Sequence, residues 1–206
     1  MITLGLTGSI GMGKSTTSVF FARQGAAVHD ADAAVHRLYR AGGAGVAAVA
    51  ARFPAALSQG SIDRTVLASL VQGDAAALAA LEAIVHPLVR AEQAAARARC
   101  RAEGRRVLVL DIPLLLETGG DRHVDAVIVV TAPADLQRAR VLARPGMNEA
   151  RLAAILARQM PDAEKRRRAH FVVETNGGML AAERAVADIL RAVAPMAAGL
   201  APLRRV

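Results

Sequence analysis

The chain has 206 residues, of which 53% are hydrophobic and 2% aromatic, and its formal net charge is +8. This length and hydrophobicity indicate a folded domain rather than a disordered chain. The scarcity of aromatic side chains argues against a reader of single-stranded nucleic acid, because such proteins stack bases on aromatic rings. We interpret most of the positive charge as part of an arginine-rich composition, although it also suits an anionic partner such as a nucleotide.

The single cysteine, Cys100, excludes an intramolecular disulfide and a cysteine metal cluster, which fits a reducing compartment. The N-terminal residues lack a basic segment followed by an apolar stretch, so they do not resemble a signal peptide. The apolar segment 42–57 is interrupted by Arg52 and Pro54 and is too short to cross a bilayer. We therefore expect a cytoplasmic protein that does not insert into membranes.

Short apolar segments along the chain predict buried strands at residues 2–7, 26–29, 106–111, 126–130 and 171–174. Helical patterns occupy residues 15–24, 134–143, 149–168 and 180–193. Residues 32–98 are expected to be mostly helical, with interruptions at Gly42–Gly43, Pro54, Gly60 and His86–Pro87. The tail from Pro195 is expected to be loosely ordered.

Apolar strands that alternate with helices predict an α/β fold with a mostly parallel sheet covered on both faces. In such sheets, ligands bind at the carboxyl ends of the strands. Gly8, Asp30, Asp111 and Thr131 all end or follow predicted strands. We therefore expect them at one edge of the sheet, which marks the candidate active site.

A glycine-rich segment follows the first predicted strand. Residues 8–15 read Gly-Ser-Ile-Gly-Met-Gly-Lys-Ser and match the P-loop pattern G-x-x-x-x-G-K-[ST]. The glycines allow backbone N–H groups to surround phosphate oxygens at a helix N-terminus. Lys14 is expected to reach the β- and γ-phosphates, Ser15 to bind Mg²⁺ and Thr16 to contact the α-phosphate. Because the chain has no Asn-Lys-x-Asp motif for guanine, a small-molecule kinase is favoured over a GTPase.

Carboxylates that suit a kinase follow two of the strands. Asp32 fits a group that orients an acceptor hydroxyl and accepts its proton, with Asp30 sharing the work at Mg²⁺. Asp32 also fits a helix N-cap, and Asp30 a turn residue. Asp111 fits either a Walker-B-type acid, binding Mg²⁺ directly or through water, or a cap for the turn that follows. Glu117 lies just beyond and fits an acceptor pocket.

Several separate blocks together resemble the dephospho-CoA kinase family over nearly the whole chain. These blocks are residues 5–16, 30–36, 60–64, 81–90, 111–117, 140–147 and 157–166. The resemblance implies phosphoryl transfer from ATP, with Mg²⁺ as cofactor, to the ribose 3′-hydroxyl of 3′-dephospho-CoA, the last step of coenzyme A synthesis.

The same resemblance implies a three-layer P-loop NTPase fold with about five central strands, formed by a single domain over residues 1–206. Its core is expected at about 1–30, 104–135 and 169–194. A helical acceptor-binding region is expected at about 31–100, and a helical lid at about 138–168.

The resemblance also assigns site residues by position. The residues expected to be catalytic are Asp32 as the base, Lys14, and Arg140, which would offset charge on the transferred group. The residues expected to bind ATP are Gly11, Met12, Gly13, Lys14, Ser15, Thr16 and Asn176. The acceptor is expected to contact Asp32, His86, Arg90 and Glu117, and the metal Ser15 and Asp111. His86 also fits a hydrogen-bonded histidine at a proline bend, and Asn176 a turn.

Three positions depart from the family pattern without altering the expected chemistry. Gln59 stands where aspartate is more common, Pro54 where glycine is common and His170 where aspartate is usual. Two other functions stay open at this stage: a P-loop kinase for a nucleotide, nucleoside or shikimate-like acceptor, and a non-catalytic nucleic-acid binder. We expect ATP and 3′-dephospho-CoA as partners, no nucleic acid or membrane, and a monomer or weak homo-oligomer.

Overall fold

The structure is a computed structural model that describes residues 1–197. Contacts divide the chain into two compact units, residues 1–29 together with those from 100 onward, and residues 30–99. The tail expected to be loosely ordered begins inside a helix that extends to Ala197, and its remainder lies outside the described residues. No helix in the described part of the chain combines the length and apolarity needed to span a bilayer.

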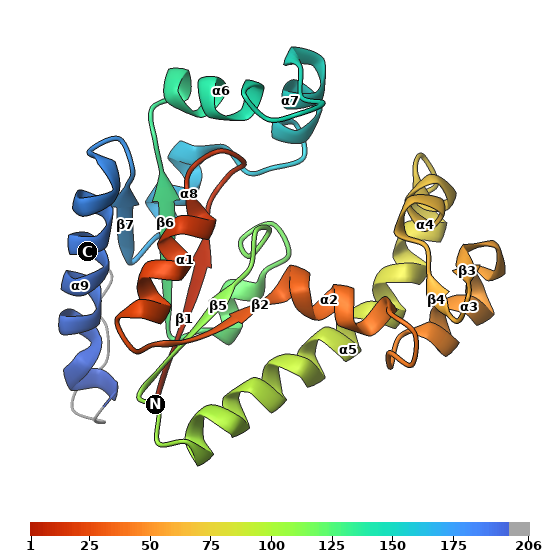
Figure 1. Cartoon of the computed structure of the whole chain (residues 1–206), viewed down its shortest axis with the longest axis horizontal. Helices are drawn as coiled ribbons and strands as arrows, with labels where there is room; N and C mark the ends of the chain where they lie inside the picture. Colours follow the sequence, from red (N-terminus) through yellow and green to blue (C-terminus); the bar gives the residue numbers. More distant parts are fainter. Residues whose placement is uncertain (198–206) are drawn as a thin grey trace. The chain divides into compact units, whose positions relative to one another are not determined.

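The first unit is built on a five-stranded sheet in the order β2-β5-β1-β6-β7 (Figure 1). The central strand β1 (Ile2–Thr7) pairs in parallel with β5 (Val107–Asp111) and with β6 (Ala126–Thr131). At one edge of the sheet, β7 (Phe171–Glu174) pairs in parallel with β6. At the other edge, β2 (Ala27–Asp30) lies beside β5. All five predicted strands are present, so the prediction of a mostly parallel sheet is confirmed.

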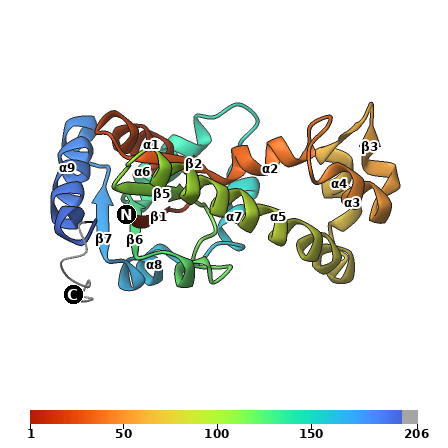
Figure 2. The same ribbon diagram turned by 90° about the horizontal axis from the view of Figure 1, so that it is seen from below.

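Helices and loops cover both faces of this sheet. Helices α1 (Lys14–Arg23) and α9 (Gly178–Ala197) lie side by side on one face (Figures 1 and 2). Alternate residues of β6, at positions 126, 128 and 130, belong to the core on that face. The residues between them, at 127 and 129, pack against Leu115 and Leu116 on the opposite face. Because successive side chains of a strand point to opposite faces, β6 packs against a layer on each face of the sheet, and the unit has three layers.

Three helices lie between β6 and β7 in the described chain: α6 (Ala134–Leu142), α7 (Glu149–Leu156) and α8 (Asp162–Arg168), of which α8 contacts β6. The helical pattern predicted over 149–168 is therefore interrupted at residues 157–161. Pro161 is the N-cap of α8, and it disfavours helical geometry at Met160, the last residue before it. A short 3₁₀ helix, η2 (Gly120–His123), lies between β5 and β6.

The second unit contains the helices α2 (Ala31–Tyr39), α3 (Val46–Arg52), α4 (Arg64–Val71) and most of α5 (Ala75–Ala102). It also contains a 3₁₀ helix, η1 (Pro54–Ala56). Its own apolar core includes Leu38, Val49, Phe53, Leu67 and Val85. The unit therefore buries a core that is distinct from that of the sheet.

The predicted interruption at His86–Pro87 is wrong, because the helical backbone of α5 continues through Pro87. A proline inside a helix removes one backbone donor and costs about 3 kcal/mol. The apolar face of α5 offsets this cost by packing against the core of the second unit, through Leu81, Ile84, Val85, Leu88 and Val89. Tertiary packing here outweighs the local preference.

The predicted interruption near Gly60 is a hairpin of two short strands, β3 (Leu57–Ser58) and β4 (Ser61–Ile62). Its two loop residues, Gln59 and Gly60, have positive φ angles of 47° and 76°. Two successive positive φ angles define a type I′ turn, which favours Asn-Gly over Gln-Gly.

We expect Gln59→Asn to raise the free energy of unfolding by about 0.5–1 kcal/mol, because asparagine tolerates the left-handed conformation better than glutamine. Urea unfolding of the whole chain measures the change. Gln72→Asn is the matched control, since Gln72 is also exposed but has a φ of −69°. Equal effects of the two substitutions would contradict the turn explanation.

The other two positions that depart from the family pattern, Pro54 and His170, are compatible with the local structure. Pro54 occupies the first position of η1, where no backbone donor is needed. The Nδ1 atom of His170 accepts the N–H of Val127 at 3.1 Å. A carboxylate could accept the same hydrogen bond, so histidine replaces aspartate here without loss of the acceptor.

Candidate active site

The glycine-rich loop leaves the carboxyl end of β1 and enters α1 at Lys14. A Cβ atom at Gly8 would lie 2.6 Å from the carbonyl oxygen of Val130, so no side chain fits there. Gly11 and Gly13 have φ angles of +79° and +93°, a region that other residues rarely adopt. The close approach and the two left-handed positions explain why this sequence needs glycine at all three places.

Side chains from outside the loop bind three successive carbonyl groups of its backbone. Gln137 Nε2 donates to the carbonyl oxygen of Ile10 at 2.8 Å. Arg140 Nη1 lies 3.5 Å from the carbonyl oxygen of Gly11. Thr175 Oγ1 donates to the carbonyl oxygen of Met12 at 2.9 Å. These three carbonyl groups are therefore held by α6 and by the residue that follows β7.

This arrangement fixes the direction of the loop's N–H groups. In a trans peptide the C=O of one residue and the N–H of the next point in opposite directions. The N–H groups of Gly11, Met12 and Gly13 therefore face away from the side chains that bind the carbonyls. The N–H of Met12 donates to Ser9 at 3.2 Å, which closes the turn. The N–H groups of Gly11 and Gly13 remain directed as an anion-binding cradle requires.

A cavity of about 330 Å³ lies against this loop. Such a volume is in the range of small-molecule sites. Its lining comes from the loop and α1, from α6 and its C-terminal end, and from the β7–α9 connection: Gly11, Gly13, Thr16, Thr17, Arg140, Arg144, Thr175, Gly178, Met179 and Ala182. Helix α6 ends at Leu142, and Arg140 and Arg144 both line the cavity. The guanidinium group of Arg140 also donates to Oγ1 and to the carbonyl oxygen of Thr175, at 2.8 and 2.9 Å.

The acid predicted to lie at the end of a strand lies next to the lysine of the loop. Asp111 ends β5, where it is opposite Leu6 in the register with β1, and its side chain is 5% exposed. Its carboxylate forms an ion pair with the ammonium group of Lys14. The structure thus brings together the predicted lysine and the predicted metal-binding acid, and Ser15 follows Lys14 in the first turn of α1.

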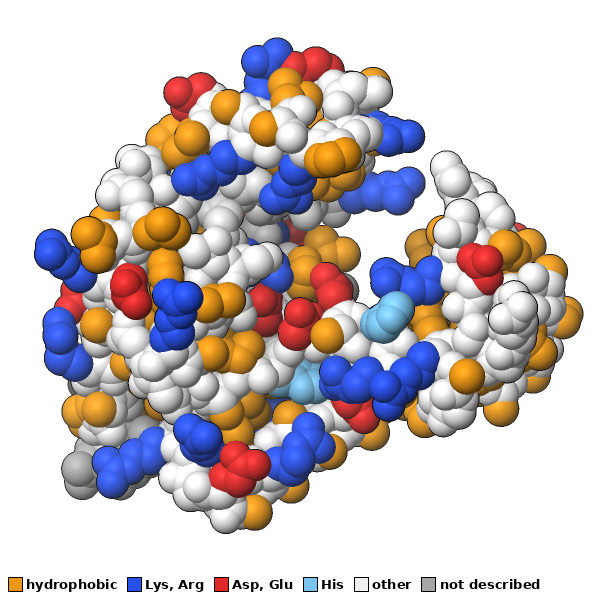
Figure 3. All heavy atoms as spheres, viewed as in Figure 1, with side chains coloured by type: hydrophobic (Ala, Val, Ile, Leu, Met, Phe, Trp, Pro, Cys, Tyr) orange, Lys and Arg blue, Asp and Glu red, His pale blue; other side chains and the backbone are white. Residues whose placement is uncertain are grey.

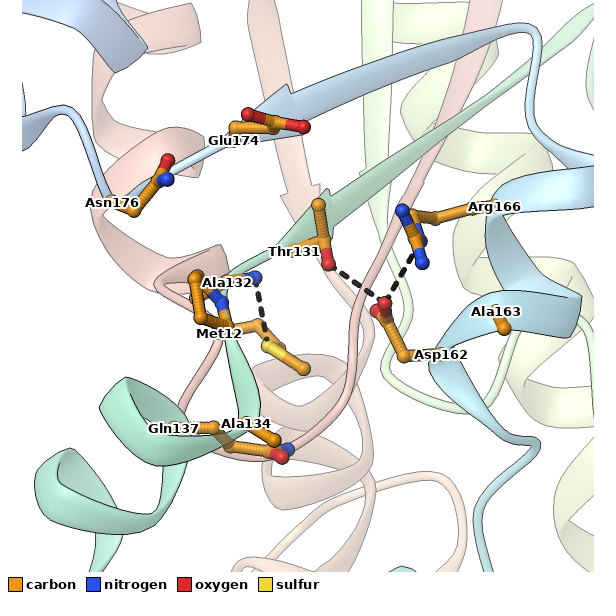
Figure 4. Close-up of a pocket in the computed structure, with 11 residues that line it drawn as sticks. Met12, Thr131, Ala132, Ala134, Gln137, Asp162, Ala163, Arg166, Glu174 and Asn176 are labelled. Atoms are coloured by element: carbon orange, nitrogen blue, oxygen red, sulfur yellow. Dashed lines mark hydrogen bonds and ion pairs between the residues drawn. The ribbon is translucent and has the colours of Figure 1, made fainter.

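A second cavity of about 380 Å³ lies at the carboxyl ends of β6 and β7 (Figure 4). Thr131 donates to Asp162 at 2.8 Å there, and Arg166 pairs with the same carboxylate at 3.0 Å. Asn176 lines this second cavity, whereas its neighbour Thr175 lines the cavity at the glycine loop. Sequence reasoning singled out Asn176, whose contact with ATP stays a prediction, and missed Thr175.

Glu117 has structural partners in the first unit. Its Oε1 atom accepts the N–H of Met160 at 2.9 Å and lies 2.8 Å from Nζ of Lys165. The side chain of Lys165 is completely buried and that of Glu117 is 15% exposed. Glu117 therefore holds the segment before α8 in place, and the predicted contact of Glu117 with an acceptor stays a prediction.

The other predicted acceptor residues belong to the second unit. Asp30 is the N-cap of α2, because its carboxylate accepts the N–H of Ala33 at 3.0 Å. The cap alternative for Asp32 is therefore wrong, and its exposed carboxylate lies in the first turn of the helix. His86 and Arg90 are exposed and four residues apart on α5, so they share one face. His86 is exposed directly before Pro87, and the alternative of a histidine at a proline bend stays open.

Basic side chains do not gather in one region of the visible surface. Figure 3 shows lysine and arginine at several separate places, interspersed with aspartate and glutamate. This distribution agrees with a basic composition spread along the whole chain.

A parallel sheet with a P-loop between its central strand and α1, together with Arg140 of α6 bound to this loop, defines a P-loop kinase. The dephospho-CoA kinase family matches residues 2–181. The chain therefore belongs to the dephospho-CoA kinase family, whose members catalyse the final, ATP-dependent step of coenzyme A synthesis. The family predicted from the sequence blocks is confirmed.

Individual relatives agree with this assignment. The dephospho-CoA kinase of Mesorhizobium japonicum is 59% identical over 192 residues, which cover 92% of this chain and 95% of that protein. The crystal structure of the Thermus thermophilus protein TT1252 has a TM-score of 0.81 and 37% identity, and the match covers 93% and 97% of the two chains. The dephospho-CoA kinase from Campylobacter jejuni has a TM-score of 0.62, 22% identity and coverage of 93% and 96%, which supports the fold.

Proposed function

We propose that this chain transfers the γ-phosphoryl group of ATP to the ribose 3′-hydroxyl of 3′-dephospho-CoA, with the glycine loop as the ATP site. One observation carries the proposal: the loop's carbonyl groups are held from outside by Gln137, Arg140 and Thr175. This hold directs the following N–H groups towards a bound anion. The family assignment supports 3′-dephospho-CoA as the acceptor.

In this mechanism Asp32 orients the 3′-hydroxyl and accepts its proton as the oxygen attacks the γ-phosphorus. Two observations support this role: Asp32 is exposed, and Asp30 rather than Asp32 caps α2. An acid that caps a helix is less available to a substrate. Arg90 and His86 offer a positive and a polar side chain on one helical face, which suits the diphosphate of the acceptor. Glu117 is proposed as a further acceptor contact.

On the donor side, Lys14 binds the β- and γ-phosphates, and Thr16 contacts the α-phosphate. Arg140 and Arg144 offset the charge that spreads over the transferred group. The N–H groups of Gly11 and Gly13 hold the phosphates in line with the acceptor. Asn176 is proposed to contact the adenine end of ATP.

Magnesium fits the residues at the loop. Asp111 presents a nearly buried carboxylate beside Lys14, and the hydroxyl of Ser15 is one residue further along the chain. One hydroxyl and one carboxylate, with phosphate oxygens, form a set of ligands that Mg²⁺ prefers. Ser15 would hold the ion, and Asp111 would hold it directly or through water. When bound, Mg²⁺ would neutralise charge on the β- and γ-phosphates.

An acceptor screen tests the proposal. ADP release is measured with ATP and Mg²⁺ in the presence of 3′-dephospho-CoA, shikimate, adenosine, AMP or no acceptor. We expect turnover with 3′-dephospho-CoA to exceed that with every other acceptor by at least about 10²-fold, because the site must contact more of this acceptor than its hydroxyl. Faster turnover with another hydroxyl acceptor would contradict the substrate assignment.

The reaction without acceptor tests the proposed lid, residues 138–168. Closure over the substrates excludes water from the γ-phosphate, so we expect ATP hydrolysis at less than about 1% of the transfer rate. Comparable rates of hydrolysis and transfer would mean that the segment does not exclude water.

Measuring the affinity for DNA or RNA at several salt concentrations tests the alternative of a nucleic-acid binder. Such a protein would bind, and its affinity would fall steeply as the salt concentration rises. The family assignment favours the kinase. A cytoplasmic location and a monomeric or weakly associating state remain part of the proposal.

A further inference from the structure

One residue of the glycine loop, Ile10, is bound from two directions by two glutamines that lie far from it in sequence. Gln137 Nε2 donates to its carbonyl oxygen at 2.8 Å. Its own N–H donates to Oε1 of Gln159 at 3.1 Å. Gln137 lies on α6 and is 7% exposed, whereas Gln159 lies in the segment 157–161 between α7 and α8. The peptide groups on both sides of Ile10 are therefore held.

One glutamine donates a hydrogen bond and the other accepts one, and the backbone group of Ile10 that each contacts determines its role. Only the oxygen of a side-chain amide can accept from the N–H of Ile10, and only its nitrogen can donate to the C=O. Gln159 must therefore act as an acceptor and Gln137 as a donor. A carboxylate has acceptors and no donor when ionised, so glutamate can replace Gln159 but not Gln137.

The hydrogen bond from Gln137 bears directly on phosphate binding. It fixes the orientation of the peptide between Ile10 and Gly11, and thereby the direction of the N–H of Gly11. Gly11 has a φ of +79° and lines the cavity at the loop. A peptide that rotated here would turn the N–H away from the phosphates and present a carbonyl oxygen to them instead.

The hydrogen bond to Gln159 ties the loop to the far end of α7. The next residue, Met160, donates its N–H to Glu117 at 2.9 Å. Glu117 is in turn paired with the buried Lys165 of α8. The segment 157–161 is thus anchored at adjacent residues to the loop and to a buried ion pair, while Gln137 binds the loop from directly before the proposed lid.

We propose that Gln137 and Gln159 are positioning residues that set the phosphate-binding geometry of the loop, Gln137 from directly before the segment 138–168 and Gln159 from within it. The inference rests on the proposed role of the loop as the ATP site. It names two residues for this site that act through the backbone of Ile10, and Gln137 also lines the cavity that contains Asn176.

Four variants test the inference in the full-length chain: Gln137→Glu, Gln137→Met, Gln159→Glu and Gln159→Met. The two glutamate variants bring the same negative charge next to the same residue. A difference between them reports the polarity of the hydrogen bond when the methionine variant at the same position shows the loss that occurs without added charge. The methionine variants remove each hydrogen bond without adding charge.

We expect Gln137→Glu to raise the KM for ATP by about 10–100-fold, because it leaves a carbonyl facing a carboxylate, and Gln137→Met by about 5–50-fold. Gln159→Met is expected to raise the KM for ATP by about 3–10-fold, and Gln159→Glu to restore it to within about threefold of the wild type. The KM for 3′-dephospho-CoA should change by less than about threefold in all four variants. Thermal unfolding identifies any variant that is misfolded, and Gln137→Met keeps the test valid if Gln137→Glu does not fold.

Equal losses in the two glutamate variants would attribute the effect to charge and overturn the inference. Unchanged ATP affinity in both methionine variants would overturn it as well. Equilibrium binding of a fluorescent ATP analogue with Mg²⁺ to the wild type separates this outcome from failure of the proposed function. A wild type that does not bind the analogue contradicts the ATP site itself.

Discussion

Replacement of Asp32 with asparagine is expected to lower kcat by about 10²–10⁴-fold, because the amide cannot accept the proton of the 3′-hydroxyl. Asparagine has nearly the same shape, and Asp32 is exposed in the first turn of α2, so folding should be preserved. The affinity for ATP should stay within about threefold of the wild type. Steady-state kinetics with both substrates and equilibrium binding of ATP measure the two effects separately.

Asp30→Asn is the matched control for this prediction. Asp30 lies two residues earlier and caps α2 through the N–H of Ala33, a role that asparagine performs equally well. We therefore expect a much smaller loss of kcat in Asp30→Asn than in Asp32→Asn. Near-normal turnover in Asp32→Asn would refute the base assignment, and a reversed order would transfer the role to Asp30.

Replacement of Lys165 with methionine is expected to lower the free energy of unfolding by about 3–5 kcal/mol. The ammonium group is completely buried, and it lies 2.8 Å from Glu117. Its removal leaves the Glu117 carboxylate in a largely buried site without its charged partner, and such a charge is costly. Unfolding in guanidinium chloride, followed by circular dichroism, measures the change.

The exposed ion pair between Arg138 and Glu149 provides the control. These side chains are 62% and 58% exposed, so Arg138→Met should change the free energy of unfolding by less than about 1 kcal/mol. A double variant, Lys165→Met with Glu117→Leu, should recover part of the stability lost in Lys165→Met, because no buried charge remains. Similar small effects at Lys165 and Arg138 would show that the buried pair does not hold α8.

The core of the site could be predicted from sequence because its signals are local. The spacing of Gly8, Gly13 and Lys14 after an apolar strand identifies the loop, and an acid at the end of a second strand identifies Asp111. Parallel strands place their carboxyl ends together, so the contact between Lys14 and Asp111 follows from topology. The family could be predicted because its motif blocks extend along the chain.

The residues that hold the loop carry no such signal. Gln137, Gln159 and Thr175 act through single hydrogen bonds to backbone atoms that lie more than 100 residues away in sequence. A lone glutamine on a helix is ordinarily a surface residue. Only the folded chain shows that these side chains bind the backbone of the loop.

The wrong predictions about local structure have similar causes. Local preference predicted an interruption at Pro87, but packing of the apolar face of α5 maintained the helix. The strands β3 and β4 have two residues each and a Gln-Gly turn, so neither alternation nor an Asn-Gly signal was present. The predicted cap at Asp32 failed because Asp30, two residues earlier, accepts the bond instead.

The central claim is that the loop delivers the γ-phosphoryl group of ATP to the acceptor and not to water. Its most direct test uses ATP labelled in the γ-phosphate, with Mg²⁺ and 3′-dephospho-CoA, and follows the label by mass spectrometry. We predict one labelled phosphate on the ribose 3′-oxygen of CoA for each ADP released. Label that appears in inorganic phosphate, or at another position of the acceptor, would contradict this account.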